Sequence, residues 1–178
     1  MAELNLSAVD EVIKARKTLH GGGKGKPRKL TDKDLEGAAL NRATVVFLSA
    51  TLQAFVGEIF MECSKKAFGH EFTDKKIDNY LATWRNWGNP SPSNIVTLFR
   101  RLGIDDVLDG LSWKAQSNAK LRSNLDALNQ IRNKIAHGQE LKLNGKPFSL
   151  QFNQVVRWRN ICKSFSENFR EHALGRIK

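Results

Sequence analysis

Apolar residues recur every three to four positions along most of the chain, which is the spacing of one face of an α-helix. The pattern predicts helices over residues 4–19, from 31 to about 67, 73–87, 93–101, 118–137 and about 149–174. Between Glu140 and Leu150 the pattern alternates around Asn144-Gly145, a pair typical of a type I′ hairpin turn. We therefore expect an all-α, bundle-like domain of four to five helices with one small β-hairpin.

The segment from residue 31 to about 67 is apolar on more than one face. A helix of this kind is central, packed on several sides, or lies in a dimer interface. The β-branched run Thr44-Val45-Val46 would also suit a strand, but the length of the segment favours a helix.

Capping residues set the expected helix ends. Thr31, followed by two acids, is expected to begin the long helix, and Ser93 to begin the helix that stops near Gly103. Gly138 directly follows the segment 118–137 and is expected to end it.

The N-terminal part of the chain differs in composition from the rest. Basic residues gather between Lys14 and Lys33 together with four glycines and a proline, which predicts a flexible basic loop. Its GGGKGK stretch lacks the GK[ST] ending and the preceding strand of a phosphate-binding loop, so a solvated linker is favoured over nonspecific RNA contact. We divide the 178 residues into an N-terminal helix and basic loop (1–30) and a helical domain (31–178).

The charge balance indicates a polyanionic partner. The chain has 29 Lys and Arg against 18 Asp and Glu, a formal net charge of +11. Nucleic acid fits this excess, although an anionic membrane or a merely soluble surface would also fit. No run approaches the roughly 20 apolar residues of a membrane-spanning helix, and the N-terminus lacks a hydrophobic signal core. A cytoplasmic protein without a membrane partner is expected.

Neither the cysteines nor the histidines are spaced as metal ligands. Cys63 and Cys162 each lie in an apolar helical pattern, which predicts buried thiols. The four histidines do not form a motif such as HExxH. We expect no metal site and no cofactor.

The segment 118–137 carries an arginine in its apolar stripe. Leu121, Leu125, Leu128, Arg132 and Ile135 follow a 4-3-4-3 spacing that places them on one helical face. A guanidinium group is costly to bury unless it is paired or faces a wet cleft that holds an anion. Arg132 is therefore either a paired core arginine or an anion-binding residue.

His137 follows five residues later, at the expected end of the helix. In an unbroken helix it would point about 140° away from Arg132, so we expect unwinding over Ala136 and His137 to turn the imidazole back. An arginine fork suits a phosphate, and an imidazole, with a pKa in water of about 6.5, can exchange protons with the 2′-hydroxyl or the 5′-oxygen of RNA. The alternative is a histidine that only caps the helix.

The residues Arg132-Asn-Lys-Ile-Ala-His137-Gly resemble the R-x4-H signature of the HEPN superfamily. The stretch from Asn41 to Glu58 is similar to the early long helix of its RiboL-PSP-HEPN branch. Relatives often have Glu where this chain has Gln53, which puts a role for that carboxylate in doubt.

The resemblance implies a helical domain that forms a homodimer, with two R-x4-H motifs facing one another across a basic groove. It implies a metal-independent endoribonuclease that attacks with the 2′-hydroxyl of its RNA substrate, often a toxin or a phage-defence effector. Arg132 would hold the phosphate, His137 would be the general acid or base, and Asn133 would support the site. A cognate antitoxin or regulatory protein is a possible partner.

Other residues have two readings each. Lys134 and Arg42 are candidate RNA contacts, and an ion pair at the end of the core is the alternative for Arg42. Trp84, Trp87 and Trp158 lie near arginines and could stack RNA bases, but such tryptophans are more often core or interface. The alternative function for the whole chain is a catalytically inactive RNA- or protein-binding module.

Overall fold

The structure, a computed structural model, describes residues 2–19, 35–69, 73, 75, 77–79 and 87–177. Its elements are the helices α1 (Ser7–Thr18), α2 (Ala38–Phe68), α4 (Pro92–Arg100), α5 (Asn118–Ala136) and α6 (Phe152–Gly175), and the strands β1 (Lys142–Leu143) and β2 (Lys146–Pro147). The two strands pair antiparallel. The predicted all-α fold with a small hairpin is confirmed.

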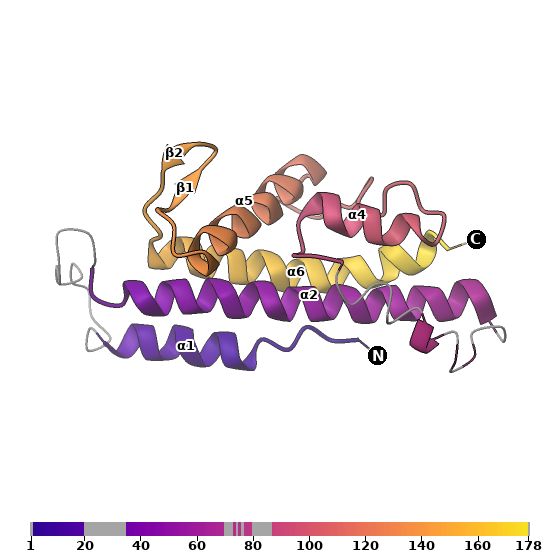
Figure 1. Cartoon of the computed structure of the whole chain (residues 1–178), viewed down its shortest axis with the longest axis horizontal. Helices are drawn as coiled ribbons and strands as arrows, with labels where there is room; N and C mark the ends of the chain where they lie inside the picture. Colours follow the sequence, from indigo (N-terminus) through magenta and orange to yellow (C-terminus); the bar gives the residue numbers. More distant parts are fainter. Residues whose placement is uncertain are drawn as a thin grey trace.

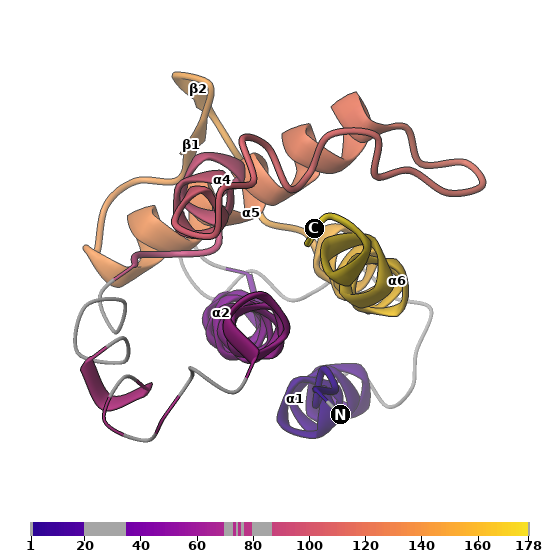
Figure 2. The ribbon, with the colours of Figure 1, turned by 90° about the vertical axis from the view of Figure 1, so that its right-hand side faces the viewer.

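Helix α2 is the centre of the fold. It packs against α1, α4, α5 and α6 (Figure 1). Helices α1, α2 and α6 run with nearly parallel axes and are seen end-on in Figure 2, while α5 lies across them. The C-terminal end of α5 therefore comes down beside the N-terminal halves of α2 and α6 (Figure 1).

The central position of α2 accounts for its apolar composition. Val45, Leu48, Leu52, Val56 and Ile59 are completely buried. By length and mean hydropathy, 1.6 over 18 residues, α2 is apolar enough to cross a membrane. No apolar run of that length had been found in the sequence. Because 56% of that window is buried inside the fold, α2 has the pattern of a helix surrounded by other helices. The sequence-based prediction of a central helix, rather than a strand, is confirmed.

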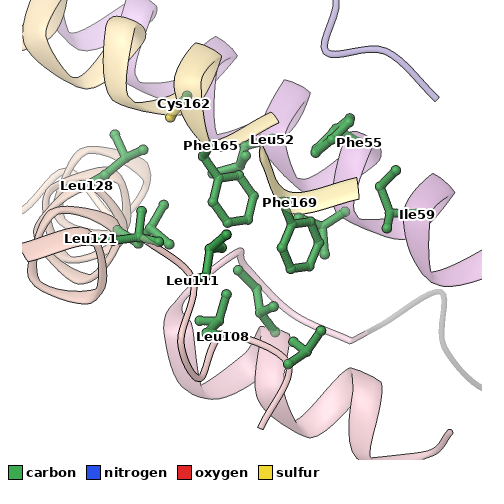
Figure 3. Packing of buried hydrophobic residues seen from close by; sticks show 14 of the residues in the cluster. Leu52, Phe55, Ile59, Leu108, Leu111, Leu121, Leu128, Cys162, Phe165 and Phe169 are labelled. Carbon is green, nitrogen blue, oxygen red and sulfur yellow. The ribbon is translucent and has the colours of Figure 1, made fainter. Parts of the chain in front are cut away.

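Phenylalanine rings join α6 to α2 and α4 in the core (Figure 3). Phe165 and Phe169 of α6 stack with ring centroids 4.6 Å apart. Phe55 of α2 meets Phe165 edge-on at 6.5 Å, and Phe99 of α4 meets Phe169 edge-on at 5.6 Å. Edge-on and offset contacts of this kind add to the free energy gained by burying the rings.

Helix α1 is part of this same packed body. Arg16, which the sequence pattern had assigned to the basic loop, is buried with its guanidinium 5.6 Å from the centre of the Phe152 ring in α6. Asp10 forms an ion pair with Arg159 of α6 at 2.6 Å. Residues 20–34, which include the glycine-rich part of the predicted loop, lie outside the described part of the chain.

Two predicted helix starts were wrong. Helix α2 begins at Ala38, after a turn at residues 35–37, whereas the cap predicted at Thr31 lies outside the described residues. Ser91, not Ser93, caps α4, because Ser91 is extended and its hydroxyl oxygen accepts a hydrogen bond from the Asn94 N–H. Most of the predicted helix 73–87 also lies outside the described residues, and Lys75 and 77–79 are helical.

Two further sequence interpretations have clear outcomes. Asn144 and Gly145 both have positive φ, 51° and 77°, so the predicted type I′ hairpin turn is confirmed. Trp158 is buried and stacks on Phe148 with ring centroids 6.2 Å apart, so the favoured interpretation of this ring as part of the core is confirmed, and the alternative of a platform for RNA bases was wrong.

We expect Phe165→Ala to lower the free energy of unfolding by about 3–5 kcal/mol, because it leaves a cavity between α2 and α6. Phe47→Ala is the matched control, since Phe47 is a helical phenylalanine that is 47% exposed, and it should change stability by less than about 0.5 kcal/mol. Urea unfolding followed by circular dichroism measures both. Equal effects of the two substitutions would contradict this description of the core.

Candidate functional site

The C-terminal end of α5 is fixed by hydrogen bonds that close the helix. The N–H of Gly138 donates to the Ile135 carbonyl at 3.1 Å, and the N–H of Gln139 donates to the Lys134 carbonyl at 2.9 Å. This pair of bonds is a Schellman motif, which needs a left-handed residue after the helix, and Gly138 has φ +60°. The prediction that Gly138 ends the helix is confirmed, and two backbone hydrogen bonds fix the position where α5 ends.

Arg132 lies beside the apolar stripe of α5 and not in it. Leu121, Leu125 and Leu128 are buried as predicted, but Ile131 takes the next core position. Arg132 is half-buried. The sequence pattern had assigned Arg132 to the core because residues 131 and 132 are neighbours, and either of them continues the spacing of Leu121, Leu125 and Leu128. The correction moves the guanidinium to the border between core and solvent.

The partner of Arg132 is an uncharged side chain. Its Nη1 donates to Oδ1 of Asn133 at 3.2 Å. Among the described residues no carboxylate pairs with it, whereas other partly buried arginines pair with acids at 2.6–2.8 Å: Arg122 with Asp106, Arg159 with Asp10 and Arg170 with Glu62. The interpretation of Arg132 as an arginine locked to an interior acid therefore finds no support in the described part of the chain.

A comparison shows what a paired arginine does in this fold. Partial burial disfavours the charge on Asp106, yet its pKa is lowered, because Arg122 donates two hydrogen bonds to the carboxylate. No carboxylate of the described residues accepts from Arg132 in this way. A half-buried guanidinium with only a neutral acceptor keeps most of its capacity to bind an anion.

Asn133 connects Arg132 to a loop between α2 and α4. Its Oδ1 also accepts from Nδ2 of Asn89 at 2.7 Å. Asn89 lies between the predicted helices 73–87 and 93–101, and no sequence pattern pointed to it as a site residue. An asparagine between a glycine and a proline is so common in turns that it gave no functional signal.

Gln53 of α2 holds the same loop. Its Nε2 donates to the Gly88 carbonyl at 2.8 Å. A glutamate at this position could not make this hydrogen bond, because a carboxylate cannot donate to a carbonyl oxygen and an amide nitrogen can. Gln53 therefore holds the loop in place of supplying a carboxylate.

His137 is the last residue of the helical spiral and is exposed. Ala136 remains helical, whereas His137 is the C-cap of α5, with φ −97° and ψ 9°, outside the helical region. Of the expected unwinding over Ala136 and His137, the part at His137 is confirmed and the part at Ala136 was wrong, because the Schellman motif closes the helix after Ala136. In an ideal helix, residues five positions apart lie about 140° apart around the axis. Among the described residues no hydrogen bond joins Arg132 to His137.

The remaining predicted contact residues lie near the surface. Lys134, half-buried, donates from Nζ to Oε1 of Gln139 at 2.9 Å, directly beyond the helix end. Arg42 is exposed in the first turns of α2. Neither position tests RNA binding, and both roles stay predictions.

No metal-binding cluster is present among the described residues, where no three His, Cys, Asp or Glu side chains come together. Cys63 and Cys162 are free and buried, as predicted. Burial raises the pKa of each thiol to about 12, so neither is a nucleophile near neutral pH.

An open groove of about 510 Å³ lies near the start of α5, lined by residues between Gly110 and Lys120 that include Trp113 and Gln116. It is at the opposite end of the helix from Arg132, roughly 20 Å away at 1.5 Å per residue. The groove is therefore separate from the Arg132–Asn133 site.

The family model described as RiboL-PSP-HEPN matches residues 71–174, more than half of the chain. The matched region includes α4, α5, the hairpin and nearly all of α6, while α1 and α2 lie before it. No curated protein and no solved structure matches the chain.

We expect Asn133→Asp to abolish anion binding at Arg132, because it places a carboxylate where the amide oxygen now accepts. Affinity for inorganic phosphate, measured by NMR titration, should fall about ten-fold or more. Stability should stay within about 1 kcal/mol of the wild type, because the new ion pair offsets the unfavourable charge near the helix C-terminus.

Asn124→Asp is the control, since it adds the same charge to α5 two turns before Arg132. In the described part of the chain, the hydrogen bond of the Asn124 side chain goes to the Lys120 carbonyl of its own helix. Equal loss of phosphate affinity in both variants would show that net charge, and not the Arg132 site, governs binding.

Proposed function

Because the chain belongs to the RiboL-PSP-HEPN family, we propose that it is an endoribonuclease that cleaves RNA with the substrate's own 2′-hydroxyl group and without a metal ion. HEPN domains are often ribonucleases. The observation that carries the proposal is Arg132: a half-buried guanidinium, without a carboxylate partner in the described chain, within an R-x4-H motif at a helix end.

Arg132 has the chemistry to bind the scissile phosphate. A guanidinium carries five N–H donors, and within the described residues Arg132 makes one hydrogen bond to another side chain. The remaining donors can bind two phosphate oxygens and stabilise the charge that develops on them as the 2′-oxygen attacks. The excess of basic residues, +11 overall, supports an RNA substrate.

His137 supplies proton transfer in this proposal. The 2′-hydroxyl loses its proton as the 2′-oxygen bonds to phosphorus, and the 5′-oxygen gains one as its bond to phosphorus breaks. The products are a 2′,3′-cyclic phosphate and a 5′-hydroxyl. The exposed imidazole at the end of α5 can take up or deliver such a proton.

A homodimer would complete the site. The reaction needs a base and an acid at once, and one R-x4-H motif offers a single imidazole. Two motifs facing one groove would supply both imidazoles and two arginines around one phosphate. Lys134 and Arg42 are proposed to contact the flanking RNA.

The biological role proposed with this activity is that of a toxin or phage-defence effector in the cytoplasm. A cognate antitoxin or regulatory protein would hold the activity in check. Expression of the wild type should then arrest bacterial growth, and His137→Ala should relieve the arrest.

A second candidate is a binding module that holds RNA without cutting it. This candidate is favoured if the chain acts as a monomer, because one R-x4-H motif offers a single imidazole for a reaction that needs both a base and an acid. The two candidates differ in one assay, because the module would bind RNA in a salt-dependent way and leave it intact.

We expect Arg132→Ala and His137→Ala each to lower the rate of RNA cleavage by about 10²–10⁴-fold, since each removes a group acting on the reacting atoms. Cleavage of a labelled oligonucleotide measures the rate, and chelation with EDTA should leave it unchanged. Arg100→Ala is the control, because Arg100 is exposed on α4 and donates to the Asp105 carbonyl. Full activity of folded His137→Ala, or loss of wild-type activity in EDTA, would refute the mechanism.

The shared site makes a separate prediction for heterodimers. A purified dimer of one wild-type and one His137→Ala protomer should keep less than about a tenth of the wild-type rate, because one imidazole is missing from the only centre. Two independent sites would instead leave half. Differently tagged protomers allow the heterodimer to be isolated, and a retained half of the rate would rule out a common centre.

A further inference from the structure

The loop that carries Asn89 is held from two sides by side-chain amides. Gln53 of α2 donates to the carbonyl of Gly88 at 2.8 Å, and Asn94 of α4 donates to the carbonyl of Asn89 at 2.9 Å. Ser91 caps α4 immediately after the loop. Residues 88 and 89 are therefore fixed to both α2 and α4, and the Asn89 side chain has a rigid base.

Gly88 allows this arrangement. Its φ is +98°, and a Cβ there would lie 2.7 Å from Nδ2 of Asn94. A larger residue would push away the amide that anchors Asn89. The loop and Asn94 are thus packed as one unit.

Asn89 and Arg132 both hydrogen-bond to Asn133, and chemistry fixes which atoms donate and which accept. A guanidinium only donates, so Asn133 must turn its amide oxygen toward Arg132. The same oxygen lies 2.7 Å from Asn89, which must therefore donate with Nδ2. Two donors on one oxygen hold the Asn133 amide, and its own Nδ2 makes no hydrogen bond within the described residues.

We propose that Asn89 is a positioning residue, which acts through Asn133 to hold Arg132 in the orientation that binds the scissile phosphate. The proposal rests on the ribonuclease function given above. Asn89 does not touch the substrate. It prevents rotation of the Asn133 amide, which keeps one side of the guanidinium on Asn133 and directs the other donors outward.

The physical reason is preorganisation. Arginine has a long, flexible side chain, and a guanidinium that must be ordered during the reaction stabilises the transition state less than one already in place. Holding the Asn133 amide also leaves its free Nδ2 as a donor beside Arg132. The substrate group recognised by this pair is an RNA phosphate.

Three variants test the role of Asn89 in the full-length chain. Asn89→Ala should lower kcat about ten-fold while changing KM less than about three-fold, because it weakens transition-state stabilisation more than substrate binding. Asn89→Asp has the same size but only accepts, so it should be at least as harmful. Asn124→Ala, which also loses one amide hydrogen bond on α5, should keep the wild-type rate.

A double-mutant cycle separates positioning from general destabilisation. In an Asn133→Ala background, Asn89→Ala should have no further effect on kcat, because its route to Arg132 is already gone. Thermal unfolding of each variant shows whether the fold is kept. A normal rate in Asn89→Ala, or independent and multiplying effects in the double variant, would overturn the proposal.

A second measurement does not depend on RNA cleavage. NMR of the arginine guanidinium groups, with the Arg132 signal assigned by its loss in Arg132→Lys, should show restricted motion in the wild type and faster motion in Asn89→Ala. If the wild type cuts no RNA but this difference in motion is present, the ribonuclease function is refuted and the positioning of Arg132 by Asn89 is retained. If Arg132 is equally mobile in both proteins, the positioning role fails whatever the activity.

Discussion

The hydrogen bond between Arg132 and Asn133 is the interaction on which the site depends. It gives a half-buried cation a neutral acceptor in place of a carboxylate. Arg122, Arg159 and Arg170, which are also half-buried, show the alternative, in which an acid satisfies the guanidinium and fixes it to the fold. A neutral partner holds the side chain without cancelling its charge, so the group stays available to an anion.

The rest of the fold places this bond at the border of the core. Helix α5 is anchored by Leu121, Leu125, Leu128 and Ile131 and ends at a closed turn after His137. Helix α2, buried on several sides, fixes the loop at residues 88–89, which in turn fixes Asn133. The packing of α5, the closed end of this helix and the hydrogen bonds of Gln53, Asn89 and Asn133 thus together position the Arg132 guanidinium. Helix α2 contributes to this although it lies outside the segment that matches the family model.

Helix positions and the R-x4-H motif were readable from the sequence because both depend on short-range spacing. Gly138 and Asn144-Gly145 were equally readable, since positive φ favours those residues. The orientation of Arg132 was not, because a stripe spaced 4-3-4-3 passes as easily through Ile131. Asn89 and Gln53 lie 44 and 35 residues in sequence from the groups they contact, and no local pattern records such pairings. Arg16 was assigned to a loop because it belongs to a basic stretch of the sequence. Its burial depends on the Phe152 ring of the last helix, which is far away in the sequence.

The most direct test of this account is a crystal structure of the protein with a fully 2′-O-methylated RNA, which binds but has no free 2′-hydroxyl to attack. We expect a backbone phosphate with oxygens about 3 Å from the Arg132 guanidinium and from Nδ2 of Asn133, with the Asn89 hydrogen bond intact. An imidazole of His137, from either protomer of a dimer, should lie beside the same linkage. RNA bound elsewhere, with Arg132 free of phosphate, would contradict it.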